Sequence, residues 1–376
     1  LIYTYSKILD AYNPTLPTDI TIYSWNLICH FLGTFTTQQT TDAATYVKDY
    51  VENNQELPTT VPITGTNLKG ETVNIQMSLP CFLNLLTTFT LKLNNNDNSA
   101  AELMNYYSNP SGPKDCQRIG YMSLAKYADI AWRVKDYMDR NHKAPSYSSY
   151  SSLGTYFGYE NLIYTYSKIL AAYDAVSQEL PASVEIKLWK AIVDPDGVWG
   201  KPVYITCDNI DSYSEDWSRM NSICDYLESW GLGASAWGRG PNTHCSVLND
   251  NSIPQNALIV DIYGGACAGT LYEMGLSYYK NWKGSLEVFT IFISPPSWDI
   301  RNCPTRDIYG RNFLPKAWDD NFSGDILPDW GFNSKGQLVK GLSNPDKYMT
   351  KNGYKFLVTS NNISKMAIAI YEQSVL

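Results

Sequence analysis

A glycine-rich segment in the second half of the chain carries the residues best suited to covalent chemistry. Cys267 is the centre of "GGACAG", which has the G-x-C-x-G form of a nucleophile elbow with cysteine as the nucleophile. An apolar run, "NALIVDIY", precedes this segment and an amphipathic run, "AGTLYEMGLSYYKNW", follows it, so we expect a strand-to-helix turn. A cysteine that opens a helix lies at the positive end of the helix dipole, which lowers the pKa of its thiol.

A histidine in an earlier loop is the candidate base for this cysteine. His244 lies in "GRGPNTHCS" and is the only histidine in this half of the chain. A Cys267–His244 pair is therefore a catalytic hypothesis, with Glu273 or Asp261 orienting the imidazole. Families with such an elbow place their histidine after the nucleophile, whereas no histidine follows Cys267. A loop that binds a polar or anionic ligand through its backbone is one alternative, and a purely structural turn is another.

Strand-like and helix-like runs alternate from about residue 200 to the end of the chain. They include "PVYITCDNI", "SEDWSRMNSICDYLESWG", "LEVFTIFI" and "YKFLVTS". This order predicts an α/β domain with a doubly wound, mostly parallel sheet, similar to a Rossmann fold. Ligands of such sheets bind beyond the carboxyl ends of the strands, beside the switch point. The ligand-binding residues predicted on this ground are Asp208, Asn209, Asn242, Gly264, Gly265 and Thr270.

Composition argues against several classes of partner. The net charge is -8 and Lys and Arg form no cluster, which argues against nucleic acid because phosphate contacts dominate such binding. The eight cysteines include no Cys-x-x-Cys pair, and we expect neither a metal nor a cofactor. No run of about 18 apolar residues is present, so no transmembrane segment is expected. The 29 Tyr and 11 Trp, together with many hydroxyl and amide side chains, suit a ligand rich in hydroxyl groups, such as a glycan.

The first half of the chain repeats two of its segments. "LIYTYSKILDAY" (Leu1–Tyr12) returns as "LIYTYSKILAAY" (Leu162–Tyr173) with a single change. "ATYVKDYVENNQELPTTVPI" (Ala44–Ile63) aligns with "AWRVKDYMDRNHKAPSYSSY" (Ala131–Tyr150). All four segments have the spacing of an amphipathic helix, followed by a proline that cannot continue it. We therefore expect a mainly α-helical repeat array ahead of the α/β domain.

The repeats and a change of composition predict the domain organisation. "AIVDPDGVWGKP" is rich in Pro, Gly and Asp and indicates a boundary. Because the chain opens within a repeated segment, further units are expected upstream. The expected division is a partial repeat at 1–32 (the second half of an upstream unit), a diverged repeat unit at 33–115, a repeat unit at 116–192 and the α/β domain at 193–376. In the best preserved unit, helices are expected at Leu124–Asp139 and Tyr159–Tyr173.

Two segments resemble pseudomurein-binding repeats, which occur in surface proteins of methanogenic archaea and in endoisopeptidases of their viruses. They are "YVKDYVENNQELPTTVPI" and "LGTYFGYENLIYTYSKILAAYDAVSQELPASVEI", and the resemblance covers roughly residues 1–190. It implies an extracellular, adhesin-like protein that is associated with the cell wall and binds pseudomurein glycan through these segments. The later segment "GPNTHCSVL…GGACAGTLYEMG" resembles a domain found behind such repeats, for which we expect a glycan or a protein partner.

Two other functions remain open from the sequence. The first is a cysteine-dependent wall hydrolase, a peptidase or amidase, in which Cys267 attacks and His244 acts as base. The transglutaminase-like endoisopeptidases have a catalytic Cys, His and Asp in that order, and this chain has Cys207, His244 and Asp261 in the same order. The cysteine of those enzymes opens a helix, whereas Cys207 is expected to end a strand. The second is a structural subunit of a surface filament or viral tail. Because no complete catalytic set is evident, binding is favoured over catalysis.

Overall fold

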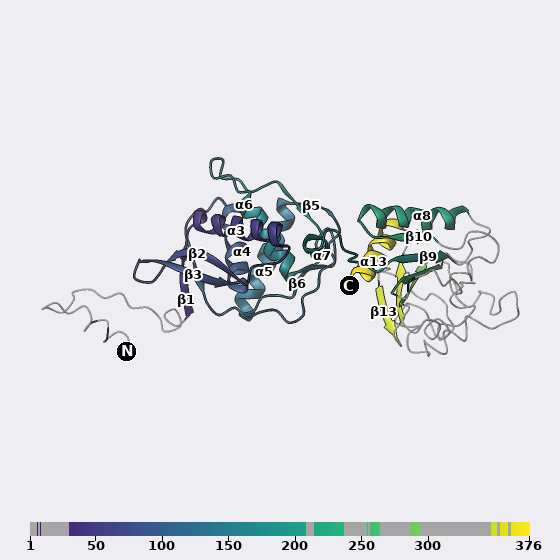
Figure 1. Cartoon of the computed structure of the whole chain (residues 1–376), viewed down its shortest axis with the longest axis horizontal. Helices are drawn as coiled ribbons and strands as arrows, with labels where there is room; N and C mark the ends of the chain where they lie inside the picture. Colours follow the sequence, from purple (N-terminus) through teal and green to yellow (C-terminus); the bar gives the residue numbers. More distant parts are fainter. Residues whose placement is uncertain are drawn as a thin grey trace. The chain divides into compact units, whose positions relative to one another are not determined.

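The computed structural model describes residues 6, 8, 30–207, 214–236, 254, 256–263, 287–293, 347–351, 354–359 and 362–376. The chain divides into two compact units, Leu1–Pro195 and Asp196–Leu376 (Figure 1). The first copy of the repeated "LIYTYSKIL", at residues 1–9, falls outside the described residues except for Ser6 and Ile8.

The described part of the first unit contains one order of elements twice, strand–helix–strand–strand–helix–strand. In each half the outer strands pair antiparallel, β1 with β4 and β5 with β8, and the inner strands form a hairpin, β2–β3 and β6–β7. The first half is β1 (Phe31–Phe35), α3 (Thr37–Asn54), β2 (Thr60–Thr66), β3 (Thr72–Ser78), α4 (Leu79–Asn94) and β4 (Ala101–Met104). The second half is β5 (Gly120–Ser123), α5 (Leu124–Asn141), β6 (Tyr147–Ser149), β7 (Tyr156–Gly158), α6 (Tyr159–Ala171) and β8 (Ser183–Ile186), followed by the short helix α7 (Trp189–Val193).

The expectation of a mainly α-helical repeat array is wrong. Each pair of helices is accompanied by four strands, and the first half builds a four-stranded sheet in the order β3-β2-β1-β4. One hydrophobic core joins both halves, from Phe35 to Ile186, so the halves are not separate modules stacked in a row. The physical reason is that the segments before and after each helix are extended. The backbone N–H and C=O groups of these segments hydrogen-bond to one another as paired strands.

The helices divide into two buried and two amphipathic ones. Helices α4 and α6 are buried along most of their length and pack against each other, while α3 and α5 each bury one face. The predicted helices are confirmed within two residues at each end. Both amphipathic helices end at a residue in the left-handed conformation, Gln55 (φ 60°) after α3 and His142 (φ 51°) after α5. His142 therefore has a structural role, because it ends helix α5.

The second unit contains a six-stranded sheet in the order β10-β9-β11-β12-β14-β13. All neighbouring strands pair in parallel except β13 and β14, which are antiparallel. Helices α8 (Ser214–Ser229) and α13 (Ile363–Val375) contact each other and the sheet, so the described helices lie on one face; the two-sided cover of a doubly wound sheet is not shown by the described residues. The strands are β9 (Val203–Cys207), β10 (Ala234–Ala236), β11 (Leu258–Tyr263), β12 (Glu287–Ile293), β13 (Lys347–Lys351) and β14 (Tyr354–Thr359).

Asp115 fastens the starts of two helices in the first unit. Its Oδ1 accepts from the backbone N–H of Gly158 (2.9 Å), the residue before α6. Its Oδ2 accepts from the side-chain amide of Asn161 (2.9 Å) and from the backbone N–H of Trp189 (2.7 Å), the first residue of α7. Free N–H groups at helix starts favour a negative charge beside them. A single carboxylate thus joins the loop at Asp115 to α6 and α7.

We expect Asp115 to make the stability of the first unit depend on pH. Burial raises the pKa of its carboxyl from 3.8 to about 6, against the lowering effect of its hydrogen bonds. Between about pH 4 and pH 6 the folded state then holds more protons than the unfolded state, so stability decreases as pH rises through this range. A shift of this size corresponds to roughly 3 kcal/mol. Urea denaturation across this range measures it, and Asp115→Asn should remove this component; parallel pH profiles of the two proteins would contradict the assignment.

Candidate functional site

Asp261 lies in β11, opposite Thr206 of β9, and Cys207 ends β9, whereas the other residues predicted for chemistry or ligand binding in the second unit lie outside the described residues. This applies to all of Cys267, His244, Glu273, Asp208, Asn209, Asn242, Gly264, Gly265 and Thr270. The described backbone pairs β9 with β11, and Cys207 lies opposite Ile262 at the carboxyl ends of these strands. The pair β9 and β11 forms the switch point of the sheet. The strand that follows β9 in the chain, β10, lies on one side of the pair, and the strand that follows β11, β12, lies on the other side. Cys207 ends a strand, as expected, and the catalytic pair and the binding loops stay predictions.

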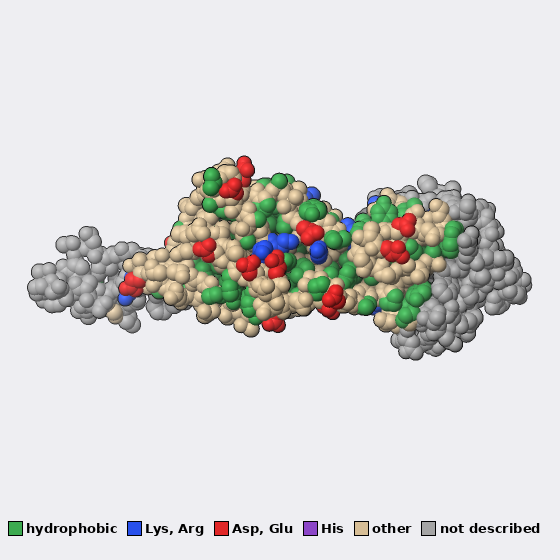
Figure 2. Space-filling view, turned by 45° about the horizontal axis from the view of Figure 1, so that its top comes forward, with side chains coloured by type: hydrophobic (Ala, Val, Ile, Leu, Met, Phe, Trp, Pro, Cys, Tyr) green, Lys and Arg blue, Asp and Glu red, His purple; other side chains and the backbone are tan. Residues whose placement is uncertain are grey.

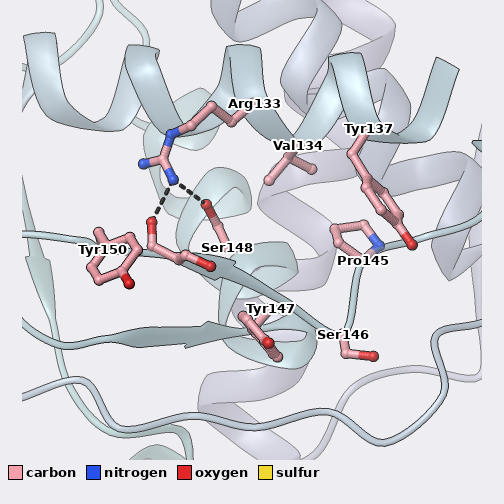
Figure 3. Close-up of a pocket in the computed structure, with 9 residues that line it drawn as sticks. Arg133, Val134, Tyr137, Pro145, Ser146, Tyr147, Ser148 and Tyr150 are labelled. Atoms are coloured by element: carbon pink, nitrogen blue, oxygen red, sulfur yellow. Dashed lines mark hydrogen bonds between the residues drawn. The ribbon is translucent and has the colours of Figure 1, made fainter. Parts of the chain in front are cut away.

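A groove in the first unit lies between α5 and the β6–β7 hairpin; we call it the α5 groove. Its volume is about 570 Å³, and its walls combine tyrosine rings with serine hydroxyls and one arginine (Figure 3). Tyr150 is 81% exposed and Tyr137 is 38% exposed, so both rings are available to a ligand. Its lining residues are Arg133, Val134, Tyr137, Pro145, Ser146, Tyr147, Ser148, Ser149 and Tyr150.

Arg133 fixes the hairpin side of this groove. Its Nη1 donates to Ser148 Oγ (3.1 Å) and to the carbonyl oxygen of Ser149, as Figure 3 shows. Its Nε donates to Asp129 Oδ2 (3.2 Å) one turn earlier in α5. The planar guanidinium presents its donors in a rigid fork, so these bonds hold α5 and the hairpin at one separation. The ring of Tyr147 is held by Tyr156 in an edge-to-face contact with centroids 4.6 Å apart. The groove is therefore largely preformed.

The first half has a corresponding groove between α3 and the β2–β3 hairpin; we call it the α3 groove. Its volume is about 420 Å³. Tyr46, which is 39% exposed, takes the position that Arg133 has in the aligned segment. The hairpin presents paired polar side chains, and Thr64 Oγ1 donates to Asn74 Oδ1 (3.1 Å). Its lining residues are Gln39, Asp42, Ala43, Tyr46, Pro62, Ile63, Thr64, Asn74, Ile75 and Gln76.

A cleft rich in hydroxyl and amide groups adjoins the α3 groove, and Asp42 lines both. The cleft lies between α3 and the end of α6 and has a volume of about 510 Å³. Tyr173 Oη donates to Asn98 Oδ1 (3.1 Å), and Asn98 Nδ2 donates to Gln178 Oε1 (2.9 Å). Thr41 and Thr45 direct their hydroxyl protons to carbonyl oxygens of α3, which leaves their lone pairs as acceptors. Such a surface accepts hydrogen bonds from a ligand that carries many hydroxyl groups.

These surfaces are suited to binding rather than to catalysis. Neither groove nor the cleft includes a cysteine or histidine among its lining residues, and Asp42 is the one carboxylate among the lining residues of the α3 groove. Aromatic walls with a few fixed polar groups are typical of sites for small ligands. The sequence pattern indicates that the two helices are equivalent, but it does not indicate the grooves. The available signal was the stretch after each proline, which is rich in hydroxyl side chains: Thr59, Thr60 and Thr64 after Pro58, and Ser146, Ser148 and Ser149 after Pro145.

Among the described residues, no helix is both long and apolar enough to cross a membrane, and no group of His, Cys, Asp and Glu side chains is arranged to hold a metal ion. No family model, curated protein or solved structure matches this chain.

Proposed function

We propose that the first unit binds the glycan of a pseudomurein-type cell wall through the α5 groove and the α3 groove. The protein would then act at the outer surface of the cell as an adhesin-like wall-binding protein, with its second unit binding a glycan or a protein partner. The observation that supports this most strongly is the recurrence of one groove, between an amphipathic helix and the hairpin that follows it, in both halves of the first unit.

The chemistry of the two grooves supports a saccharide ligand. A sugar ring has apolar C–H faces and a rim of hydroxyl groups, so it is complemented by an aromatic ring beside hydroxyl and amide groups. Tyr137 and Tyr150 provide rings in one groove, and Tyr46 provides one in the other. Two separated sites on one chain would also let it bind a polymer at two points, which strengthens attachment beyond either single affinity.

Replacing the exposed rings of the α5 groove should weaken wall binding. We expect Tyr137→Ala combined with Tyr150→Ala to reduce the affinity for isolated pseudomurein sacculi about thirtyfold, since each of the two stacked rings contributes about 1 kcal/mol. Co-sedimentation of the full chain with sacculi over a range of concentrations measures the change. Adding Tyr46→Ala in the α3 groove should lower the affinity further.

Tyr121→Ala is the matched control for these variants. Tyr121 is 72% exposed in the same unit but does not line either groove, so its loss should leave sedimentation unchanged. Equal loss of binding in the control and in the groove variant would contradict the assignment of the ligand to the groove.

A Cys267→Ala version assayed in parallel for released peptide tests the hydrolase alternative, because release by the wild type alone would establish catalysis.

A further inference from the structure

A small, charged cavity in the first unit is distinct from the two grooves. Its volume is about 250 Å³, below the range of roughly 300–1,000 Å³ that is typical of sites for drug-sized ligands. It lies between α3, α6, β8 and α7, and it shares no residue with the α3 or the α5 groove. Its lining residues are Glu52, Asn161, Tyr164, Thr165, Lys168, Glu185, Lys187, Ala191, Ile192 and Pro195.

Both carboxylates of this cavity already have a lysine partner. Glu52 pairs with Lys48 at 2.8 Å, one turn earlier in α3, and also accepts from Tyr164 Oη at 3.1 Å. Glu185 pairs with Lys187 at 3.5 Å. Basic and acidic side chains are similarly mixed on the face of the first unit seen in Figure 2. The negative charges of the cavity are therefore balanced within the chain.

Lys168 is the lysine of this cavity that takes part in neither of these two ion pairs. Its Nζ donates to the backbone oxygen of Glu185 (2.9 Å) and lies 5.4 Å from the centre of the Tyr164 ring, but it forms no ion pair with a described carboxylate. An ammonium group has three N–H donors, so two remain for a ligand or for water. Burial lowers the pKa of Lys168 more than the nearby charges of Glu185 and Glu52 raise it, so its charge is not fully compensated by its surroundings. A bound anion would supply that compensation.

We propose that this cavity binds a small carboxylate, held by Lys168 with Lys187 beside it. A singly charged anion is favoured over a dianion, because the nearby Glu52 and Glu185 would repel a dianion more strongly. A carboxylate also accepts two of the remaining N–H donors at short, charge-assisted distances. The group can belong to an acidic sugar or to a peptide, and the cavity volume limits it to a compact ligand. This inference does not depend on the proposed wall binding, since no residue of the two grooves takes part.

Calorimetric titration of the full chain with glucuronate and with N-acetylalanine tests this site. We expect at least one acid to bind, and glucuronamide and N-acetylalanine amide, which lack the charge, not to bind. Binding of glucuronate alone identifies an acidic sugar, and binding of N-acetylalanine alone identifies a peptide carboxyl group. Carbon-13 shifts of the lysine side chains should show the pKa of Lys168 rising when the acid binds.

Variants at Lys168 decide whether the binding occurs in this cavity. Lys168→Gln should weaken binding at least tenfold, since a hydrogen bond to a charged group contributes about 1.5–3 kcal/mol. Lys168→Arg keeps the charge and should retain binding, and Lys126→Gln, at an exposed lysine of α5, should bind as the wild type does. The proposal is overturned if neither acid binds, if the amides bind equally well, or if Lys168→Gln binds with wild-type affinity.

Discussion

Replacing Tyr166 with alanine is expected to lower the free energy of unfolding of the first unit by about 4 kcal/mol. Tyr166 is fully buried in α6 and is among the largest buried side chains of the described residues. Its hydroxyl donates to the backbone oxygen of Tyr127 in α5 (2.6 Å), which ties the two helices of the second half together. The substitution leaves a cavity and also removes this hydrogen bond. Urea denaturation followed by tryptophan fluorescence measures the loss.

Two further variants separate the contributions of Tyr166. Tyr166→Phe keeps the ring and removes only the hydrogen bond, so we expect a loss of about 1 kcal/mol. Tyr121→Ala removes a tyrosine that is largely exposed on β5 and should change stability by no more than about 0.5 kcal/mol. A loss below about 2 kcal/mol for Tyr166→Ala would show that the core closes around the missing ring, and that Tyr166 does not hold α5 and α6 together.

The position of Tyr166 explains what the repeated "LIYTYSKIL" contributes. Its spacing correctly predicted a helix, and five of its residues in the second copy are buried in the shared core: Leu162, Ile163, Tyr166, Ile169 and Leu170. The spacing did not distinguish core tyrosines from ligand-binding ones, because a tyrosine fits either place. In the structure Tyr166 lies in the core, while Tyr164 and Lys168 line the small charged cavity.

The strands of the first unit were harder to predict than its helices. Strands β5 and β6 have four and three residues, too few for an alternating pattern to rise above chance. Their pairing is also set by distant partners, since β5 pairs with β8 more than 50 residues later. Local sequence carries no information about such a partner, and the helical repeats suggested an all-helical array in its place.

The candidate site shows the same limit. The alignment of "ATYVKDY" with "AWRVKDY" correctly marked equivalent helices, but it could not show that a hairpin closes a groove against each of them. Conversely, the glycine-rich segment at Cys267 stood out in the sequence because the G-x-C-x-G spacing of its residues is recognisable. Grooves made of common residues such as Tyr, Ser and Thr become visible only when the fold brings them together.

Asp115→Ala is expected to destabilise the first unit by about 3 kcal/mol at pH 7. The carboxylate accepts from the backbone N–H groups of Gly158 and Trp189 and from the amide of Asn161, and alanine leaves these three donors without this acceptor. Each buried donor left unsatisfied costs about 1–3 kcal/mol. Removing a buried negative charge offsets part of that cost, which is why we expect the net loss to fall at the lower end of the sum.

Asp174→Ala is the matched control for this prediction. Asp174 also accepts from two backbone N–H groups, those of Val176 (2.8 Å) and Ser177 (3.3 Å), but it lies in an exposed turn where water replaces the lost acceptor. Its removal should leave the urea midpoint nearly unchanged. Amide hydrogen exchange locates the effect of Asp115→Ala, which should appear first in α7 and the opening turn of α6. Uniform loss of protection across the unit, or equal destabilisation by both variants, would contradict a role for Asp115 in fastening these two helix starts.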